Sequence, residues 1–234
     1  MTTVRLRGVL LDLDDTLLDQ RGAIRRALDA WLGTLGVPPT PELHRLWTDL
    51  QEHHLVAWRE RRVTFAEQRR RRLREFLPAI QIPYAEADLD RVFAGYLTAY
   101  QASYTLFDDV PPALAALAEA GLATAVLTNG TIEQQHDKIH RVGLAGRLGP
   151  VYTVEDLGVA KPDPAAFRLS CERWGLAPEA VLSVGDRHDL DVLPARAAGL
   201  RAVHLDRHGE GPPDEPSRIT SLRELPGLIR ADPG

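Results

Sequence analysis

The chain has 234 residues, of which 28 are basic and 33 acidic, and its net charge of −5 argues against a generally basic nucleic-acid-binding protein. Its length exceeds that of a usual single domain and leaves room for one large core and a smaller second unit. Cys171 is the only cysteine, which excludes an intrachain disulfide. The N-terminus has no leader pattern and no apolar run could span a bilayer. We therefore expect a cytoplasmic protein without a membrane partner.

The first predicted element is a buried strand that ends in acidic residues. The apolar run Val9–Leu11 leads into Asp12, Asp14 and Asp15. Neighbouring carboxylates raise one another's pKa and are costly to desolvate, so this cluster requires a cation, a set of hydrogen-bond donors or open solvent. Taken alone, the pattern Asp-x-Asp-x-Thr is as compatible with a helix cap or a turn as with a metal site.

Residues 18–107 form a helical region that interrupts the α/β pattern of the chain. Ala, Leu, Arg and Trp recur at three- and four-residue spacing, with breaks at GVPPTP and QIPY, which predicts four helices. This region carries a net charge of +2 and the remainder −7. We predict an α/β core made of residues 1–17 and 108–234, with an inserted helical domain at 18–107.

The inserted region contains an arginine-rich helix within WRERRVTFAEQRRRRLREF. Arg69–Arg72 are consecutive, and at about 100° per residue they wrap around the helix and form no single stripe. We therefore favour a solvated surface over a nucleic-acid-binding face. The adjacent histidines His53 and His54 are expected to be exposed and not to bind metal. The aromatic and apolar residues expected to pack inside the domain are Trp31, Trp47, Trp58, Phe65, Leu73, Phe76 and Leu77.

After the insert, short apolar runs alternate with helical segments. The runs LATAVLTNG, PVYTVED, VLSVGD and LRAVHLD are separated by segments such as VPPALAALAEAG and DLDVLPARAAG. Continuous apolar runs joined by helices are typical of a parallel sheet that is covered on both faces. We therefore predict a doubly wound, Rossmann-like parallel-sheet core of the α/β class.

Polar residues follow three of the predicted strands. Because ligands in open α/β sheets bind outside the carboxyl ends of the strands, these residues are candidates for one shared site. They could also cap helices or form turns. The residues are Asp12 and Asp14 after the first strand, Thr128 and Asn129 after the second, and Gly185 and Asp186 after a later one.

Lys161 is a further candidate because the chain otherwise uses arginine. Only two of the 28 basic residues are lysines, Lys138 and Lys161. Lys161 lies in GVAKPDPAAF, just before a helix whose start is marked by Pro162 and Pro164. A lone lysine is usually a solvated surface charge, but this one lies inside a motif.

Together, LDLDDTL, LTNG, KPDP and GDRHDLD resemble the four motifs of the haloacid dehalogenase-like superfamily, in their order and at compatible separations. The inserted region resembles that superfamily's helical cap of the first type. The resemblance implies phosphoryl transfer, in the branch of small-molecule phosphatases that includes nucleotidases, acylneuraminate phosphatases and phosphoglycolate phosphatases. Dehalogenases of this type have no leaving alkoxide to protonate, and their first motif typically lacks the second Asp, so Asp14 favours a phosphatase.

The resemblance also implies roles for individual residues. Asp12 would attack phosphorus and form an aspartyl-phosphate, and Asp14 would protonate the leaving oxygen and then take a proton from water. Mg²⁺ would be held by Asp12, the main-chain carbonyl of Asp14, and Asp186, with Asp191 orienting these ligands. The residues implied to bind or offset the phosphoryl group are Thr128, Asn129 and Lys161.

We predict a magnesium-dependent phosphatase of a small phosphorylated metabolite, in which the insert acts as a lid that excludes water. A phosphomutase of the same fold is the nearest alternative, and it would pass the phosphoryl group to a sugar phosphate in place of water. A non-catalytic regulatory or nucleic-acid-binding module that retains the fold is the alternative from another class. Measurement of turnover on a panel of phosphate esters distinguishes these three functions.

Overall fold

The computed structural model describes residues 4–231 and divides into two compact units. The first unit contains the chain up to Asp19 and from Thr105 onward, and the second unit is Gln20–Tyr104. The predicted boundaries, at 17/18 and 107/108, lie two and three residues away. The difference arises because the two connecting segments pair with each other. Leu18 forms a β-bridge with Leu106, and the Asp19 N–H donates to the Thr105 carbonyl over 3.0 Å.

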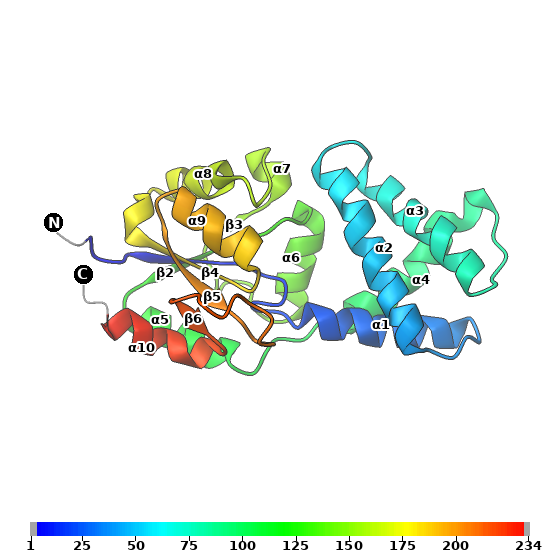
Figure 1. The fold of residues 1–234 in the computed structure, drawn as a ribbon, viewed down its shortest axis with the longest axis horizontal. Coiled ribbons are helices and arrows are strands. Elements are labelled where there is room, and N and C mark those ends of the chain that lie inside the picture. Colours follow the sequence, from blue (N-terminus) through cyan, green and yellow to red (C-terminus); the bar gives the residue numbers. More distant parts are fainter. Residues whose placement is uncertain (1–3, 232–234) are drawn as a thin grey trace. The chain divides into compact units, whose positions relative to one another are not determined.

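The first unit is built on a six-stranded parallel sheet (Figure 1). The strand order is β3-β2-β1-β4-β5-β6, so the chain builds the sheet outward on both sides of the buried strand β1. This order confirms the predicted doubly wound α/β fold. The strand β6 has no counterpart among the predicted strands, because it is only two residues long and has no apolar run. The strands are β1 (Gly8–Leu11), β2 (Ala123–Leu127), β3 (Val151–Tyr152), β4 (Val181–Gly185), β5 (Arg201–Leu205) and β6 (Arg218–Ile219).

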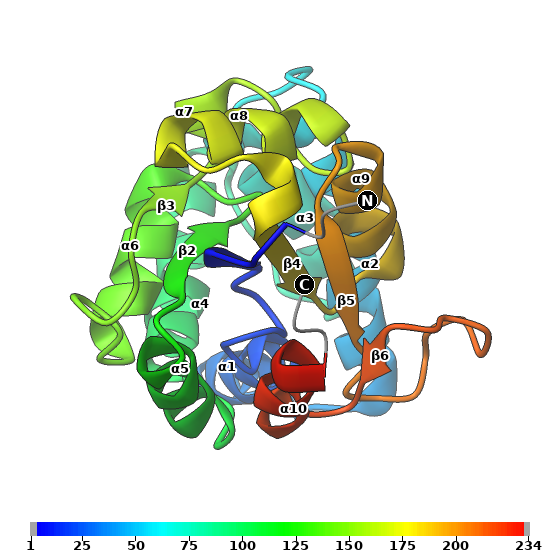
Figure 2. The same ribbon diagram turned by 90° about the vertical axis from the view of Figure 1, so that its left-hand side faces the viewer.

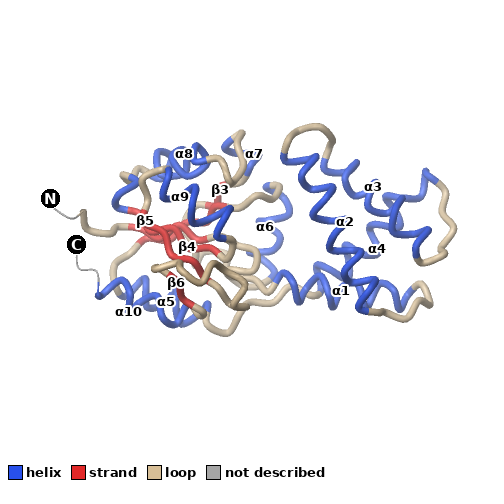
Figure 3. Tube along the Cα trace, in the orientation of Figure 1, coloured by secondary structure: helices blue, strands red, loops and turns tan. Residues whose placement is uncertain are grey.

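Helices cover both faces of this sheet (Figures 2 and 3). Helices α5 (Val110–Glu119) and α10 (Leu225–Ala231) lie on one face, and α8 (Pro164–Trp174) and α9 (Leu193–Ala197) lie on the other. Leu10 of β1 and Phe167 of α8 belong to one buried apolar cluster between sheet and helices. The remaining elements of the unit are α6 (Ile132–Arg141), α7 (Val154–Leu157), the short 3₁₀ turns η2 (Pro178–Ala180) and η4 (Leu222–Glu224), and a π-helical turn η3 (His188–Val192).

The second unit contains four α-helices, as predicted, and packs around an aromatic core. Trp31 and Trp47 are buried with their ring centroids 5.5 Å apart, and Trp58 packs on Phe65 at 4.8 Å. Thr64 begins the arginine-rich helix by accepting a hydrogen bond from a main-chain N–H of its first turn. The elements are α1 (Gln20–Thr34), α2 (Pro41–Arg59), α3 (Phe65–Ala79), the 3₁₀ turn η1 (Glu86–Asp88) and α4 (Leu89–Ala102).

Two side chains of this unit that the sequence analysis places at the surface are buried. Arg72 is 4% exposed, and its guanidinium lies 4.3 Å from the ring centroid of Trp47. His54 is 5% exposed and forms a hydrogen bond with Glu75 over 2.8 Å. Both predictions are wrong for the same reason. A guanidinium can stack on an aromatic ring and an imidazole can pair with a carboxylate, so each of these side chains can be buried in a helix interface.

The other arginines of α3 are held by partners on their own unit. Arg69 lies 4.5 Å from the ring centroid of Phe65, and Arg70 donates two hydrogen bonds to Asp90 over 2.8 and 2.6 Å. Arg71 is exposed. The run therefore forms no continuous basic face. Among residues 4–231, no helix is both long and apolar enough to cross a membrane.

Candidate active site

Polar side chains gather at the carboxyl ends of three neighbouring strands. β2, β1 and β4 are adjacent in the sheet, so the residues that follow them meet at one edge. The Asp12 N–H donates to the carbonyl of Val184 over 2.9 Å, which continues the pairing of β1 with β4. The Asp186 N–H donates to Thr16 Oγ1 over 3.1 Å, which ties the turn after β4 to the turn after β1.

Lys161 lies at the centre of this edge. Its Nζ is 2.6 Å from Asp12 Oδ1 and 2.5 Å from Asp191 Oδ1, and the residue is 3% exposed. Burial acts to lower the pKa of Lys161, but the two carboxylates outweigh it and raise this pKa above its usual value. The Asn129 side chain fixes the Lys161 backbone, because its Oδ1 accepts from the Lys161 N–H and its Nδ2 donates to the Lys161 carbonyl, each over 2.8 Å.

Asp191 reaches the site from the π-helical turn after β4. Its Oδ2 accepts a hydrogen bond from the Arg187 N–H over 3.0 Å, while its Oδ1 accepts from Lys161. A Cβ atom at Gly185 would lie 2.3 Å from Asp191 Cγ. A glycine is therefore required at the end of β4 to let this carboxylate approach the sheet.

Three carboxylates form a compact acidic cluster. Asp12, Asp186 and Asp191 each offer an oxygen atom, and these three atoms lie within 4.8 Å of one another. Burial raises the pKa of Asp12 to about 7 although Lys161 opposes the shift, and burial together with the two other carboxylates raises the pKa of Asp186 to about 9. One lysine leaves excess negative charge among three acids. Hard carboxylate oxygens in this arrangement suit a divalent cation such as Mg²⁺.

Asp14 has a separate cationic partner. Lys138 of α6 donates to both carboxylate oxygens of Asp14, over 2.6 and 2.7 Å, and Gln135 Nε2 is 3.3 Å from Oδ2. Each of the two lysines of the chain therefore contacts one of the aspartates of the first motif: Lys161 contacts Asp12 and Lys138 contacts Asp14. Neither Lys138 nor Gln135 is among the site residues predicted from the sequence. The scarcity of lysine, which singles out Lys161, is a signal that applies to Lys138 as well.

The Thr128 hydroxyl is also held from α6. Thr128 is 2% exposed, and its Oγ1 accepts a hydrogen bond from Gln135 Nε2 over 2.6 Å. The hydroxyl proton of Thr128 remains available for an acceptor at the strand end. The Asn129 amide, in contrast, uses both of its polar atoms on the Lys161 backbone. The structure therefore brings the seven predicted site residues to one sheet edge, with Asn129 engaged inside the protein.

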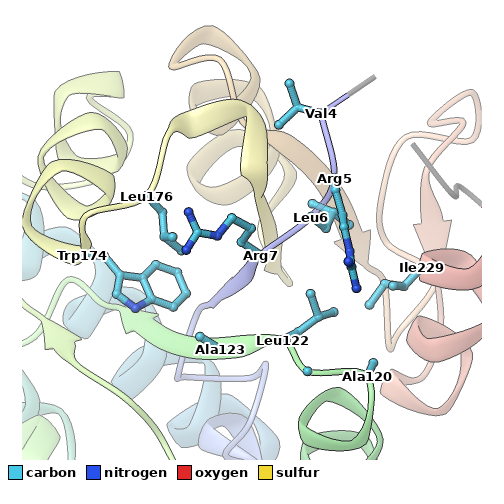
Figure 4. A pocket seen from close by; sticks show the side chains of 11 residues that line it. Val4, Arg5, Leu6, Arg7, Ala120, Leu122, Ala123, Trp174, Leu176 and Ile229 are labelled. Carbon is cyan, nitrogen blue, oxygen red and sulfur yellow. The ribbon is translucent and has the colours of Figure 1, made fainter. Parts of the chain in front are cut away.

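A cavity of about 980 Å³ lies at the opposite edge of the sheet (Figure 4). Most of its lining residues precede β1 or β2, whereas Asp12 and Thr128 follow those strands. Figure 4 shows Arg5 and Arg7 among apolar side chains there. The cavity is therefore separate from the acidic cluster. Its lining residues are Val4, Arg5, Leu6, Arg7, Ala120, Gly121, Leu122, Ala123, Trp174, Leu176 and Ile229.

Comparison with known proteins agrees with this geometry. The family model of haloacid dehalogenase-like hydrolases matches residues 6–199. The phosphoglycolate phosphatase of Escherichia coli O157:H7 is 32% identical over 207 residues, which cover 86% of this chain and 81% of that protein. The phosphoserine phosphatase of Thermus thermophilus is 40% identical over 125 residues, which cover 52% of this chain and only 50% of the relative, so the chain matches about half the length of that protein.

The fold is also found in solved structures. YfnB from Bacillus subtilis, a HAD-hydrolase whose crystal structure holds magnesium, superposes with a TM-score of 0.83 at 23% sequence identity, covering 97% of this chain and 100% of that chain. Dehalogenases are among the similar proteins as well. The family match extends over most of the chain and includes all four motifs, which confirms the resemblance noted in the sequence. The chain belongs to the haloacid dehalogenase-like hydrolase family.

Proposed function

We propose that the chain is a phosphatase that hydrolyses a small phosphorylated metabolite through an aspartyl-phosphate intermediate. The observation that carries the proposal is the pair of aspartates after β1, in which Asp12 contacts Lys161 and Asp14 contacts Lys138. A dehalogenase needs only the nucleophile. A second acid beside it has a use where a leaving alkoxide must be protonated. The phosphatases among the similar proteins support the same reaction class.

The proposed reaction has two halves. In the first, a carboxylate oxygen of Asp12 forms a bond to phosphorus, the bond between phosphorus and the ester oxygen breaks, and Asp14 gives its proton to that oxygen so that an alcohol leaves. In the second, water attacks phosphorus and gives a proton to Asp14. Inorganic phosphate leaves, and the carboxylate of Asp12 is restored.

Lys161 and Thr128 would assist by neutralising charge. The raised pKa keeps Lys161 protonated at neutral pH, so its ammonium can offset the charge shared by Asp12 and the phosphoryl group. The free proton of the Thr128 hydroxyl can be donated to a phosphoryl oxygen. Asn129 would contribute by holding the backbone of Lys161, and its main-chain amide would be the group that faces the phosphoryl oxygens.

The acidic cluster fits a magnesium ion. We propose that Asp12, Asp186 and the main-chain carbonyl of Asp14 hold Mg²⁺, with Asp191 orienting these ligands through its contact with Lys161. When bound, the ion would neutralise part of the charge of the phosphate dianion. The raised pKa values of Asp12 and Asp186 support this site, because such burial of charge calls for a compensating cation.

The test is a screen for released phosphate with a panel of phosphorylated metabolites, alongside a screen for released halide with 2-haloacids. We expect phosphate release from small esters and no halide release. Halide release without phosphate release would contradict the proposal. Transfer of the phosphoryl group to a sugar phosphate, with no net phosphate release, would identify the phosphomutase alternative, and no turnover on any ester would identify the non-catalytic one.

A further inference from the structure

We infer that Lys138 is a positioning residue for Asp14, which orients this carboxyl group and promotes its proton transfer to the leaving oxygen. This inference rests on the proposed phosphatase function. It adds Lys138 of α6 to the residues of the proposed site. Lys138 lies outside the four motifs and 124 positions from Asp14 in the sequence.

The contact fixes one side of the Asp14 carboxyl group. Lys138 Nζ lies 2.6 and 2.7 Å from the two oxygens, and the side chain of Lys138 is 3% exposed whereas that of Asp14 is 21% exposed. A buried ammonium beside a partly exposed carboxyl leaves the outer side of the carboxyl open to a ligand. The proton to be transferred would leave from that outer side.

Gln135 joins this contact to the phosphoryl-binding side of the site. Gln135 and Lys138 are three residues apart on α6 and therefore share one face of the helix. The Gln135 Nε2 donates to Thr128 Oγ1 over 2.6 Å and lies 3.3 Å from Asp14 Oδ2. A Cβ atom at Gly130 would lie 2.2 Å from Gln135 Nε2, so the glycine of the LTNG motif makes room for this amide. The turn and the helix are therefore fitted to each other around Asp14.

Lys138 acts on the orientation of the proton donor. Its two hydrogen bonds, to Oδ1 and Oδ2, hold the Asp14 carboxyl group in one orientation before the ester bond breaks. A group that is already held in its reactive orientation avoids an entropy cost in the transition state. Lys138 takes no part in the proton transfer itself, so the proton balance of the reaction is unchanged.

This role predicts an effect that depends on the leaving group. Benzyl phosphate and 4-nitrophenyl phosphate have rings of similar size, but the first must expel a strongly basic alkoxide and the second a stable phenolate. Only the alkoxide requires protonation as the bond breaks. If Lys138 instead bound the phosphoryl group directly, its loss would slow both esters alike, because both carry the same phosphoryl group.

The experiment compares kcat/KM for these two esters, since kcat/KM reports the steps up to the aspartyl-phosphate. In Lys138→Met, we expect kcat/KM for benzyl phosphate to fall on the order of 10- to 100-fold, as part of a general-acid contribution of about 10²- to 10⁴-fold is lost. For 4-nitrophenyl phosphate we expect a change of less than about threefold. The matched control is Arg141→Met, which removes an exposed cation from the same helix and should change neither value.

A second comparison uses the Asp14→Asn background. There Lys138→Met should cause no further loss that is selective for benzyl phosphate, because the acid through which it acts is absent. Circular dichroism and thermal unfolding check the fold of each variant, and Lys138→Gln replaces Lys138→Met if the latter does not fold.

The outcomes separate the inference from the function on which it rests. Equal losses for both esters in a folded Lys138 variant would overturn the positioning role while leaving the phosphatase function intact. A wild-type protein that hydrolyses neither ester nor any metabolite would overturn both.

Discussion

Lys161 Nζ lies 2.6 Å from Asp12 Oδ1, so the proposed nucleophile is in direct contact with a buried ammonium group. The same ammonium contacts Asp191, whereas no lysine contact is found for Asp186 among the described residues. The site thus combines one fixed cation with a cluster of acids that exceeds it in charge.

The first prediction concerns Asp12. Asp12→Asn keeps the size of the side chain and removes a buried charge, while Lys161 retains Asp191 as a partner. Because the amide cannot attack phosphorus, we expect kcat to fall by at least about a thousandfold with the fold preserved. Phosphate release and circular dichroism measure the two effects. Asp137→Asn, at a half-buried position of α6 that pairs with Arg141, serves as the control, and phosphate release retained in Asp12→Asn would refute the assignment.

The second prediction concerns the metal. Exhaustive chelation should abolish phosphate release, and added Mg²⁺ should restore it. Ca²⁺ should inhibit, because its larger radius and higher coordination number change how the carboxylates are bound. Activity is measured at fixed ionic strength after each addition. Undiminished activity in the chelated protein would exclude a metal requirement.

The third prediction concerns stability and pH. The pKa values of Asp12 and Asp186 are raised by burial to about 7 and about 9, so in the metal-free protein these groups bind protons more tightly when folded than when unfolded. Their contribution to stability is therefore present at acid pH and is lost as pH rises through these two values. In the presence of a chelator, the midpoint temperature of thermal unfolding should decrease as the pH is raised from 5 to 9. Added Mg²⁺ should raise the midpoint more at pH 9 than at pH 5, and an equal shift at both would contradict the cluster.

The fourth prediction concerns the glycine at the end of β4. Gly185→Ala would place a Cβ 2.3 Å from Asp191 Cγ, and Asp191 is held by both Lys161 and the Arg187 N–H. We expect a loss of about 1–3 kcal/mol in the free energy of unfolding and a lower kcat. Denaturant unfolding and phosphate release measure both. The control is Gly33→Ala in α1, where the added Cβ meets no atom within 4 Å and the fold should gain up to about 1 kcal/mol. Equal effects of the two substitutions would contradict the close approach.

The fifth prediction concerns Arg72. Burial lowers the pKa of Arg72 to about 10, and its guanidinium stacks on Trp47 and donates to Gln51 over 2.9 Å. Arg72→Gln should cost about 1–3 kcal/mol in the free energy of unfolding, whereas Arg71→Gln at the surface should change it by less than about 0.5 kcal/mol.

Neither substitution should change hydrolysis of 4-nitrophenyl phosphate. The wild-type protein should show no salt-sensitive binding to DNA or RNA, because the arginines of α3 form no continuous face. A complex that weakens steeply with salt and is lost in Arg71→Gln would identify a nucleic-acid-binding surface.

Much of the core fold could be predicted because its signals are local. Apolar runs and their terminal polar residues mark β1, β2 and β4, and parallel strands bring their carboxyl ends to one edge. The strand β6 has no such signal, because Arg218–Ile219 is held by main-chain pairing with β5. The orientation of Arg72 is likewise set by the aromatic rings around it and not by its neighbours in sequence.

The contact of Lys138 with Asp14 could not be predicted from spacing. The two residues are 124 positions apart, and only the direction in which α6 leaves the LTNG turn decides which of its residues face Asp14. By contrast, Lys161 lies in a motif that a family resemblance can identify. One sequence signal is common to Lys138 and Lys161: they are the two lysines among 28 basic residues.

The pairing of Leu18 with Leu106 affects how this protein can evolve by insertion. The point at which residues 20–104 leave the core and the point at which they return are held side by side, and all six strands of the sheet come from outside that range. The sheet and its acidic edge therefore impose no length on what is inserted between these two points. A domain of another size or fold could be inserted between these same two points in place of the four helices. New substrates would then become accessible without a change in the chemistry.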